Sequence, residues 1–356
     1  MKSLFAPAAL LMAATIFAES PTSPDQVLLK EYRPKSIYHI PETHVEKAKY
    51  PVIDVHTHVY AGDDAAVEKW VKTMDEVGLE KSIILSGNVG DKLDTVIARF
   101  GKFPKRFEVW CGIDNTGCEQ PGFVEHAIAE LERCKKAGAR GVGELSDKGR
   151  GLSGAPGMHF DDPRMDPILE KCADLGLPIN VHIGEDQWMY EPMDLHNDGL
   201  MNGYTWRIAT KDTNVLSHDA VLATLENAVK KHPRTTIIAC HFANCSADLN
   251  RLGAMLDKYP NLYADMAARF TEITPIPRFV NKFFTKYQDR LLYGTDNTPV
   301  AGMYQTSFRI LETEDEHFYP AYFAKYHWPS HGFGLSDKVL KKIYRANALK
   351  IIERNK

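Results

Sequence analysis

The first reactive pattern in the sequence is Asp54-Val55-His56-Thr57-His58. The apolar residues around it predict a β-strand, and side chains two positions apart on a strand point to the same face. His56 and His58 would therefore present two imidazole rings side by side on a rigid element. Imidazole nitrogens bind zinc and similar divalent ions, so the spacing predicts half of a metal site. Histidines also occur at strand ends for other reasons, and the pair alone does not establish the site.

Three later apolar segments also finish on residues that can bind a metal ion. The fifth predicted strand ends at His182, the sixth ends at His241, and Asp296 follows the eighth. Any one of them could be a polar residue that water solvates, but together with the first pair they indicate one shared site. Glu144, at the end of the fourth strand, is a further candidate. It could bind the metal or orient a ligating histidine.

The elements that must position these residues alternate regularly along the chain. Helical periodicity separates eight apolar segments, and strands that alternate with helices predict parallel βαβ units. The predicted strands are Val52–Val59, Ser82–Ser86, Phe107–Ile113, Gly141–Leu145, Pro178–Ile183, Thr235–His241, Leu262–Met266 and Leu291–Thr295.

Eight such units predict a single-domain α/β fold, the (β/α)8 TIM barrel, with the reactive residues at the carboxyl ends of the strands. The alternative is an open, doubly wound sheet. The first strand lacks the glycine-rich phosphate fingerprint that many such sheets carry, which favours the barrel.

Two long segments and a final helix complete the predicted barrel. The segments Gly184–His218, after the fifth strand, and Glu314–Leu335, after the eighth, are rich in aromatic residues. Long ordered loops in compact domains are usually functional, so we interpret both as a lid over the site. The helix Ser336–Arg354 begins with Ser336 as its expected N-cap and should cover the outside of the barrel.

The N-terminus resembles a secretory signal peptide. Met1-Lys2 is followed by an apolar run from Leu4 to Ala18, which is shorter than the roughly 20 residues of a membrane span. We therefore expect a signal peptide over residues 1–20, a lead-in over 21–50 and the barrel over 51–356, in a periplasmic or secreted protein. The alternative is a single membrane anchor.

The composition narrows the range of partners. The formal net charge is −4, and no basic tract indicates a nucleic-acid partner. No second segment is predicted to span a membrane, so a small-molecule substrate is the expected partner, while a homo-oligomer stays open.

The six cysteines form no CxxC pair. Buried free thiols are the usual case, although Cys111 with Cys118, or Cys240 with Cys245, could pair.

Five segments carry a family resemblance across most of the mature chain. They are IDVHTH (53–58), NVHIGE (180–185), ACHFAN (239–244), LLYGTD (291–296) and IYRANALKIIE (343–353). Together they resemble the amidohydrolase superfamily, and more closely the branch of aminocarboxymuconate-semialdehyde decarboxylase and its relatives.

The resemblance implies a ligand set and a divalent metal, zinc first and manganese second. It implies that His56, His58, His182 and Asp296 bind the ion, and that His241 acts as an acid/base or second-metal ligand. Many relatives with two metals carry a bridging carboxylated lysine on the fourth strand. This chain has Glu144 there, so either a carboxylate bridges two metals or the site holds one.

Three functions are compatible with these residues. The first is a metal-dependent hydrolase acting on a carboxylic ester, lactone or amide, in which Asp296 takes the proton of an activated water and His241 polarises the carbonyl. The second is a non-oxidative decarboxylase with the same metal site, and the third is a non-catalytic metal-binding barrel. Arg269 and Arg150 could bind a substrate carboxylate. The alternative for each is a solvated or ion-paired arginine.

Overall fold

The computed structural model describes residues 23–323 and 325–353, so the predicted signal peptide lies outside the described residues. The chain divides into two compact units, Met1–Arg33 and Pro34–Lys356. The described part of the first contains the short 3-10 turns η1 (Pro24–Gln26) and η2 (Leu29–Glu31). Residues 34–50 of the predicted lead-in fall within the second unit, together with the strands.

Eight parallel strands occur in the predicted order. They are β1 (Val52–Thr57), β2 (Leu79–Leu85), β3 (Phe107–Trp110), β4 (Val142–Asp147), β5 (Ile179–Ile183), β6 (Ile237–Ala239), β7 (Leu262–Asp265) and β8 (Leu291–Leu292). Ladder pairing joins β1-β2-β3 and β4-β5-β6-β7-β8.

Backbone hydrogen bonds also cross both seams between these sheets. The amide of Gly143 donates to the carbonyl of Cys111 at 2.7 Å, and the amide of Val55 donates to the carbonyl of Tyr293 at 3.0 Å. Each strand therefore has a neighbour on both sides, as in a (β/α)8 barrel. The barrel prediction is confirmed, and the open doubly wound sheet is excluded.

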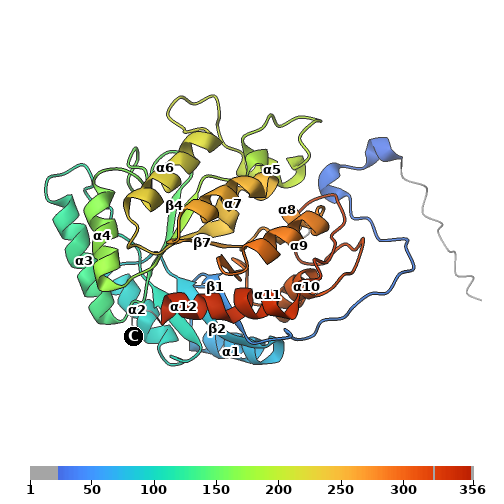
Figure 1. The fold of residues 1–356 in the computed structure, drawn as a ribbon, viewed down its shortest axis with the longest axis horizontal. Coiled ribbons are helices and arrows are strands. Elements are labelled where there is room, and N and C mark those ends of the chain that lie inside the picture. Colours follow the sequence, from blue (N-terminus) through green and yellow to red (C-terminus); the bar gives the residue numbers. More distant parts are fainter. Residues whose placement is uncertain (1–22, 324, 354–356) are drawn as a thin grey trace, which may run out of the picture. The chain divides into compact units, whose positions relative to one another are not determined.

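Helices follow the strands, and α3 and α4 lie side by side on the outside of the barrel in Figure 1. They are α1 (Asp64–Val77), α2 (Gly90–Phe100), α3 (Phe123–Ala137), α4 (Met165–Leu175), α5 (Leu200–Trp206), α6 (His218–Lys231), α7 (Leu249–Lys258), α8 (Phe270–Ile273), α9 (Pro277–Lys286) and α10 (Ala301–Glu312). Short 3-10 segments are η3 (Gln187–Met189), η4 (Cys240–Asn244) and η5 (Ser246–Asp248).

Local sequence signals account for several helix ends. Helices α1 and α3 end at Gly78 and Gly138, which adopt left-handed φ angles of 84° and 119°. Glycine accepts this conformation without a Cβ penalty, so it ends a helix readily. Helix α10 was not predicted from the sequence, because Gly302 lowers its helix propensity. Its stability comes from packing, since Phe308 lies fully buried against Tyr293.

The last helix closes one end of the barrel interior. It comprises α11 (Asp337–Lys341), a π-helical turn η6 (Lys342–Ala346) and α12 (Asn347–Ile352), and the Ser336 hydroxyl caps it as predicted. Ile351 and Ile352 of α12 pack with residues that fill the inside of the strands, including Ile53 and Trp110. The helix therefore plugs the interior, in contrast to the expected place on the outer wall.

Two further sequence expectations concern the whole molecule. The six cysteines are all buried free thiols, so neither disulfide pair considered from the sequence is formed. Within residues 23–323 and 325–353, no helix is both long and apolar enough to cross a membrane.

Candidate metal centre

His56 and His241 are held by acceptors at the end of β7. His56 Nδ1 lies 2.9 Å from Asp265 Oδ2, and His241 Nδ1 lies 2.7 Å from the carbonyl oxygen of Ala267. A carboxylate and a carbonyl only accept, so each Nδ1 carries the proton and donates it. Both rings therefore turn Nε2 toward the interior, the arrangement in which second partners orient metal-binding histidines.

His58 and His182 follow the same rule. His58 Nδ1 donates to the carbonyl oxygen of Leu85 at 2.9 Å, and His182 Nδ1 donates to Glu144 Oε1 at 2.9 Å. The strand ends thus bring four histidines together. In each of them the orienting partner bonds to Nδ1, so Nε2 is the nitrogen that can bind a metal ion. Ring centroids of His56 and His58 lie 5.3 Å apart, and those of His182 and His241 lie 4.6 Å apart.

Asp265 is a site residue that sequence reasoning missed. It is fully buried at the end of β7, and its Oδ1 also accepts the backbone amide of His241 at 2.9 Å. Burial alone would raise the pKa of this carboxyl, but the neighbouring His56 lowers it below its usual value. One carboxylate therefore holds the His56 ring and the backbone of His241. An acidic residue at a strand end, like Asp296, was the available signal.

Asp265→Asn is expected to weaken metal binding about 10–100-fold, because the amide neutralises the partner that fixes the His56 tautomer. The dissociation constant, measured by competition with a chromophoric chelator, checks this. Asp257→Asn, at an exposed position of α7, is the matched control. If Asp265→Asn binds the metal as tightly as this control and the unsubstituted chain do, the role of Asp265 is contradicted.

Asp296 closes the cluster from the end of β8. Its Oδ1 lies 3.1 Å from His58 Nε2 and accepts the Tyr60 hydroxyl at 3.2 Å, while its backbone amide donates to the carbonyl of His56 at 2.8 Å. Burial would raise its pKa, but the surrounding histidines hold it far below the usual range. Asp296 is therefore ionised and available as a ligand or proton acceptor.

Glu144 lies in the middle of the imidazoles. Its carboxylate oxygens are 3.8 Å from His56 Nε2, 3.5 Å from His58 Nε2 and 3.4 Å from His241 Nε2, in addition to the bond with His182. Both roles considered from the sequence, metal ligand and support for a ligating histidine, therefore agree with its position.

The donor set fits a divalent metal ion. Among the described residues, the Nε2 atoms of His56 and His182 are buried without a hydrogen-bond partner. Two overlapping groups have ligand atoms within 4.8 Å of one another, and both include His56. One adds His58 and Asp296, and the other adds Glu144, Cys240 and His241. Imidazole and carboxylate together suit zinc or manganese.

The pKa values of the metal-free cluster predict proton release on metal binding. Burial lowers the pKa of His56, but Asp265 outweighs it and raises the pKa to about 10. Burial likewise lowers the pKa of His182, but the neighbouring carboxylates of Glu144 and Glu185 raise it to about 8. Both rings are therefore protonated at pH 7, whereas an ion requires them neutral.

We therefore expect roughly one to two protons to leave per ion bound at pH 7, and affinity to rise as the pH increases from 6 to 8. Calorimetric titration with metal in two buffers of different ionisation enthalpy measures this number. Binding without proton release, or affinity that falls as the pH rises, would contradict the proposed protonation states.

His241 begins a left-handed backbone turn. Residues 241 to 244 have φ angles of 57°, 55°, 54° and 53°, in the left-handed region that residues other than glycine rarely adopt. Asn244 holds the turn, because its Nδ2 donates to the carbonyl oxygens of Ile183 and Gly184 at 3.0 and 3.2 Å. Burial lowers the pKa of the His241 ring, so it is neutral at pH 7.

A cavity of about 370 Å³ opens above the cluster. Strand-end residues Glu144, His182, His241 and Asp296 line one part of it, and residues of the two predicted lid segments line another. The lid segments meet, because the ring centroids of Trp188 and Trp328 lie 6.1 Å apart. The volume falls within the range of small-molecule sites.

The two predicted substrate-binding arginines differ in position. Arg150 does not line this cavity; its side chain is exposed and pairs with Asp212. Arg269 lines the cavity, but its guanidinium donates to Asn244 Oδ1 and lies 3.4–3.7 Å from three carboxylates. These carboxylates belong to Glu185, Asp186 and Glu272.

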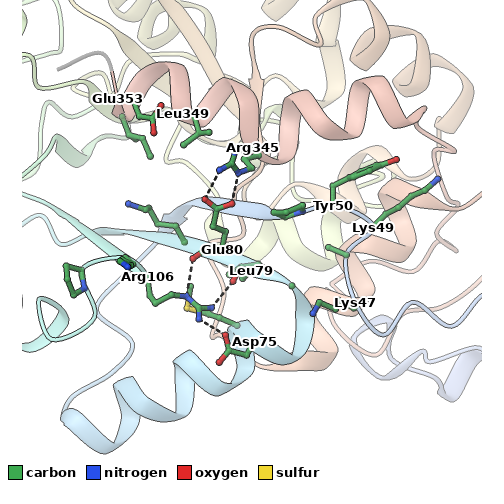
Figure 2. A pocket seen from close by; sticks show the side chains of 18 residues that line it. Lys47, Lys49, Tyr50, Asp75, Leu79, Glu80, Arg106, Arg345, Leu349 and Glu353 are labelled. Atoms are coloured by element: carbon green, nitrogen blue, oxygen red, sulfur yellow. Dashed lines mark hydrogen bonds and ion pairs between the residues drawn. The ribbon is translucent and has the colours of Figure 1, made fainter. Parts of the chain in front are cut away.

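A larger cavity of about 880 Å³ lies at the opposite, amino ends of β1–β3. Figure 2 shows two ion pairs beside it, Arg345 with Glu80 and Arg106 with Asp75. In a TIM barrel this face serves stability, whereas the carboxyl ends carry the active site. The histidine cluster is therefore the better candidate.

Comparison with known protein families finds one family model that matches this chain. A family model described as amidohydrolase matches residues 117–354, two thirds of the chain. The matched range includes Glu144, His182, His241 and Asp296. No curated protein matches the chain.

Similar solved structures share the fold. A dihydroxybenzoic acid decarboxylase from Polaromonas sp. JS666, with bound manganese and 2-nitroresorcinol, is 17% identical and has a TM-score of 0.53, covering 86% of this chain and 98% of its own. A 5-carboxyvanillate decarboxylase from Novosphingobium aromaticivorans, complexed with manganese, is 15% identical, with a TM-score of 0.51 and coverages of 88% and 100%. A probable 2-pyrone-4,6-dicarboxylic acid hydrolase from Acinetobacter baumannii is 12% identical, with a TM-score of 0.51 and coverages of 85% and 99%.

The family match covers more than half of the chain, and the fold and the donor set agree with it. These findings support an enzyme that depends on a divalent metal. The chain belongs to the amidohydrolase family.

Proposed function

We propose that this enzyme is a metal-dependent carboxy-lyase, which removes carbon dioxide from an aromatic or similarly unsaturated acid without oxidation. The observation that carries the proposal is one cavity lined by His241, by other residues of the metal-binding cluster and by two lysine side chains, Lys148 and Lys325. Such a cavity offers positive charge for an acid and a proton carrier beside it. The names of two similar solved structures, both decarboxylases, support this choice over hydrolysis.

The bound ion would be held by His56, His58, His182 and Asp296, and would supply Lewis-acid polarisation of substrate oxygens. Zinc or manganese both suit these donors, and the two decarboxylases contain manganese.

His241 is the proposed proton carrier. In decarboxylation the bond between the ring carbon and the carboxylate carbon breaks, and its electron pair stays on the ring carbon, which takes a proton. His241 Nε2 can accept a proton from the substrate's own acidic group and return it to that carbon, because Nδ1 remains bonded to Ala267 throughout. The lowered pKa of His241 makes its protonated form a stronger acid, which favours this transfer.

The test is release of carbon dioxide from a panel of acids by the metal-loaded enzyme. The panel begins with 2,6-dihydroxybenzoate and 5-carboxyvanillate, and product is identified by mass spectrometry in deuterated water. We expect one deuteron on the carbon that lost the carboxylate, and no product after chelation. Ring opening of 2-pyrone-4,6-dicarboxylate, with no carbon dioxide from any acid in the panel, would replace decarboxylation by hydrolysis.

Hydrolysis is the second candidate, and the position of Glu144 favours it. A carboxylate with one oxygen near His182 and His241 and the other near His58 lies where two ions could share it. Two-metal sites are typical of hydrolytic enzymes, in which they stabilise the attacking and leaving oxygens. The proposed export through the leader at residues 1–20 points the same way, because exported enzymes often process nutrients.

A further inference from the structure

We propose that Lys325 and Lys148 form a second anion-binding subsite in the cavity, so that the substrate carries two anionic groups. This inference rests on the proposed function, in which one carboxylate of the substrate lies at the metal cluster. The second group, a carboxylate or another anion, would lie at the two lysines. The subsite therefore predicts that the substrate is a dianionic aromatic acid.

The guanidinium of Arg269, the expected carboxylate clamp, is already engaged. Besides its two bonds to Asn244 Oδ1, Arg269 donates through Nη1 to the carbonyl of Ala268 at 3.2 Å. Three carboxylates surround it within 3.7 Å, and the residue is only 6% exposed. Its charge is balanced and its donors are in use, so it orders the buried network and leaves the recognition of anions to other cations.

The Arg269 network ties the two lid segments to the barrel. Glu272, one of its carboxylates, accepts the hydroxyl of Tyr326 at 3.1 Å, and that hydroxyl accepts Asn202 Nδ2 at 3.1 Å. Asn202 belongs to α5 in the first lid segment, and Tyr326 belongs to the second. Both segments are therefore held beside the cavity, and the second of them carries Lys325.

Lys148 comes from the loop after β4, four residues beyond Glu144. Its ammonium pairs with Glu185 on one side and lies 5.0 Å from the centroid of the Trp206 ring on the other. Trp206 and Met189 both line the cavity and give it an apolar wall. An aromatic ring lying against this wall would bring its substituent close to the Lys148 ammonium.

Lys325 supplies a second, exposed positive charge, which acts on Glu272 without forming an ion pair with it. Its side chain lines the cavity from the second lid segment, and within residues 23–323 and 325–353 no carboxylate forms an ion pair with it. Its neighbours fix its place, because Phe323 packs on Phe270 with centroids 5.1 Å apart and Tyr326 stacks on Trp328 at 4.2 Å.

The charges that line the cavity are therefore separated. The carboxylates of Glu144 and Asp296 belong to the metal side, Glu185 is shared by Lys148 and Arg269, and Lys325 forms no ion pair with these carboxylates. A ligand with a single carboxylate satisfies the metal side and leaves Lys325 unused. A ligand with two anionic groups uses both ends, and charge-assisted hydrogen bonds to lysine strengthen its binding.

The experiment is calorimetric titration of the metal-loaded enzyme with benzoate and with the three benzene dicarboxylates (1,2-, 1,3- and 1,4-). We expect at least one dicarboxylate to bind about tenfold or more tightly than benzoate, because it gains a charge-assisted contact. Lys325→Met should abolish this preference, and Lys325→Arg should keep much of it. Lys282→Met, at an exposed position of α9, is the matched control.

Lys148→Met serves as the second variant and should reduce the same preference. The inference is overturned if no dicarboxylate binds more tightly than benzoate, or if the preference survives in both lysine variants. Binding does not require turnover, so the two proposals can fail separately. Dicarboxylates that bind at the lysines while no acid releases carbon dioxide would keep the subsite and refute the decarboxylase.

Discussion

The purified enzyme is expected to carry about one zinc or manganese ion per chain, and His56→Ala and Asp296→Ala to lose at least nine tenths of it. Removing an orienting partner alone weakens metal binding about 10–100-fold, and removing a ligand should cost more. His56 is fully buried in the cluster, and Asp296 supplies a charged donor on its cavity side. Elemental analysis by mass spectrometry, beside circular dichroism to confirm folding, measures the effect.

His126→Ala is the matched control for these variants, because His126 is an exposed histidine of α3 that pairs with Asp114. Its metal content should equal that of the unsubstituted enzyme. Full metal content in folded His56→Ala would refute the assigned ligands. Two ions per chain would instead make Glu144 a shared ligand and turn the search toward hydrolytic substrates.

His241→Asn should lower kcat by about 10²–10⁴-fold while the chain keeps its metal. The asparagine amide can still donate a hydrogen bond to the Ala267 carbonyl, but it cannot carry a proton to the reacting carbon. The loss should fall on kcat more than on KM, because the substrate's carboxylate contacts lie elsewhere in the cavity. Steady-state kinetics with the best acid of the panel, together with metal analysis of the same sample, provide the measurement.

The outcome that would count against His241 as the proton carrier is an unchanged kcat in a metal-loaded variant. Loss of metal in step with activity would place His241 among the ligands instead. His126→Asn again provides the control, since it alters an imidazole outside the cavity.

Most of the strand-end residues could be predicted because their position follows from local sequence. An apolar β-branched segment fixes a strand, and parallel strands of a barrel place their carboxyl ends on one face. His56, His58, His182 and Asp296 needed no further information to be brought together. The barrel itself followed from the alternation of strands with helices.

Other features depend on contacts between distant segments, which no local pattern contains. The bond between Asp265 and His56 joins β7 to β1, and two of the three carboxylates around Arg269 come from the distant segment after β5. A lone arginine after a strand looks the same in sequence whether its charge is free or balanced. The plug formed by α12 likewise depends on packing against residues from most of the strands.

The left-handed turn that begins at His241 has a consequence for attempts to make this enzyme more robust. Each non-glycine residue in that conformation costs roughly 1–2 kcal/mol, so Ala243→Gly should raise the melting temperature. The same change would widen the range of conformations open to the segment that carries His241. Thermostability and turnover should therefore trade against each other at this turn, and laboratory evolution for heat resistance alone would drift toward a stable but slow enzyme.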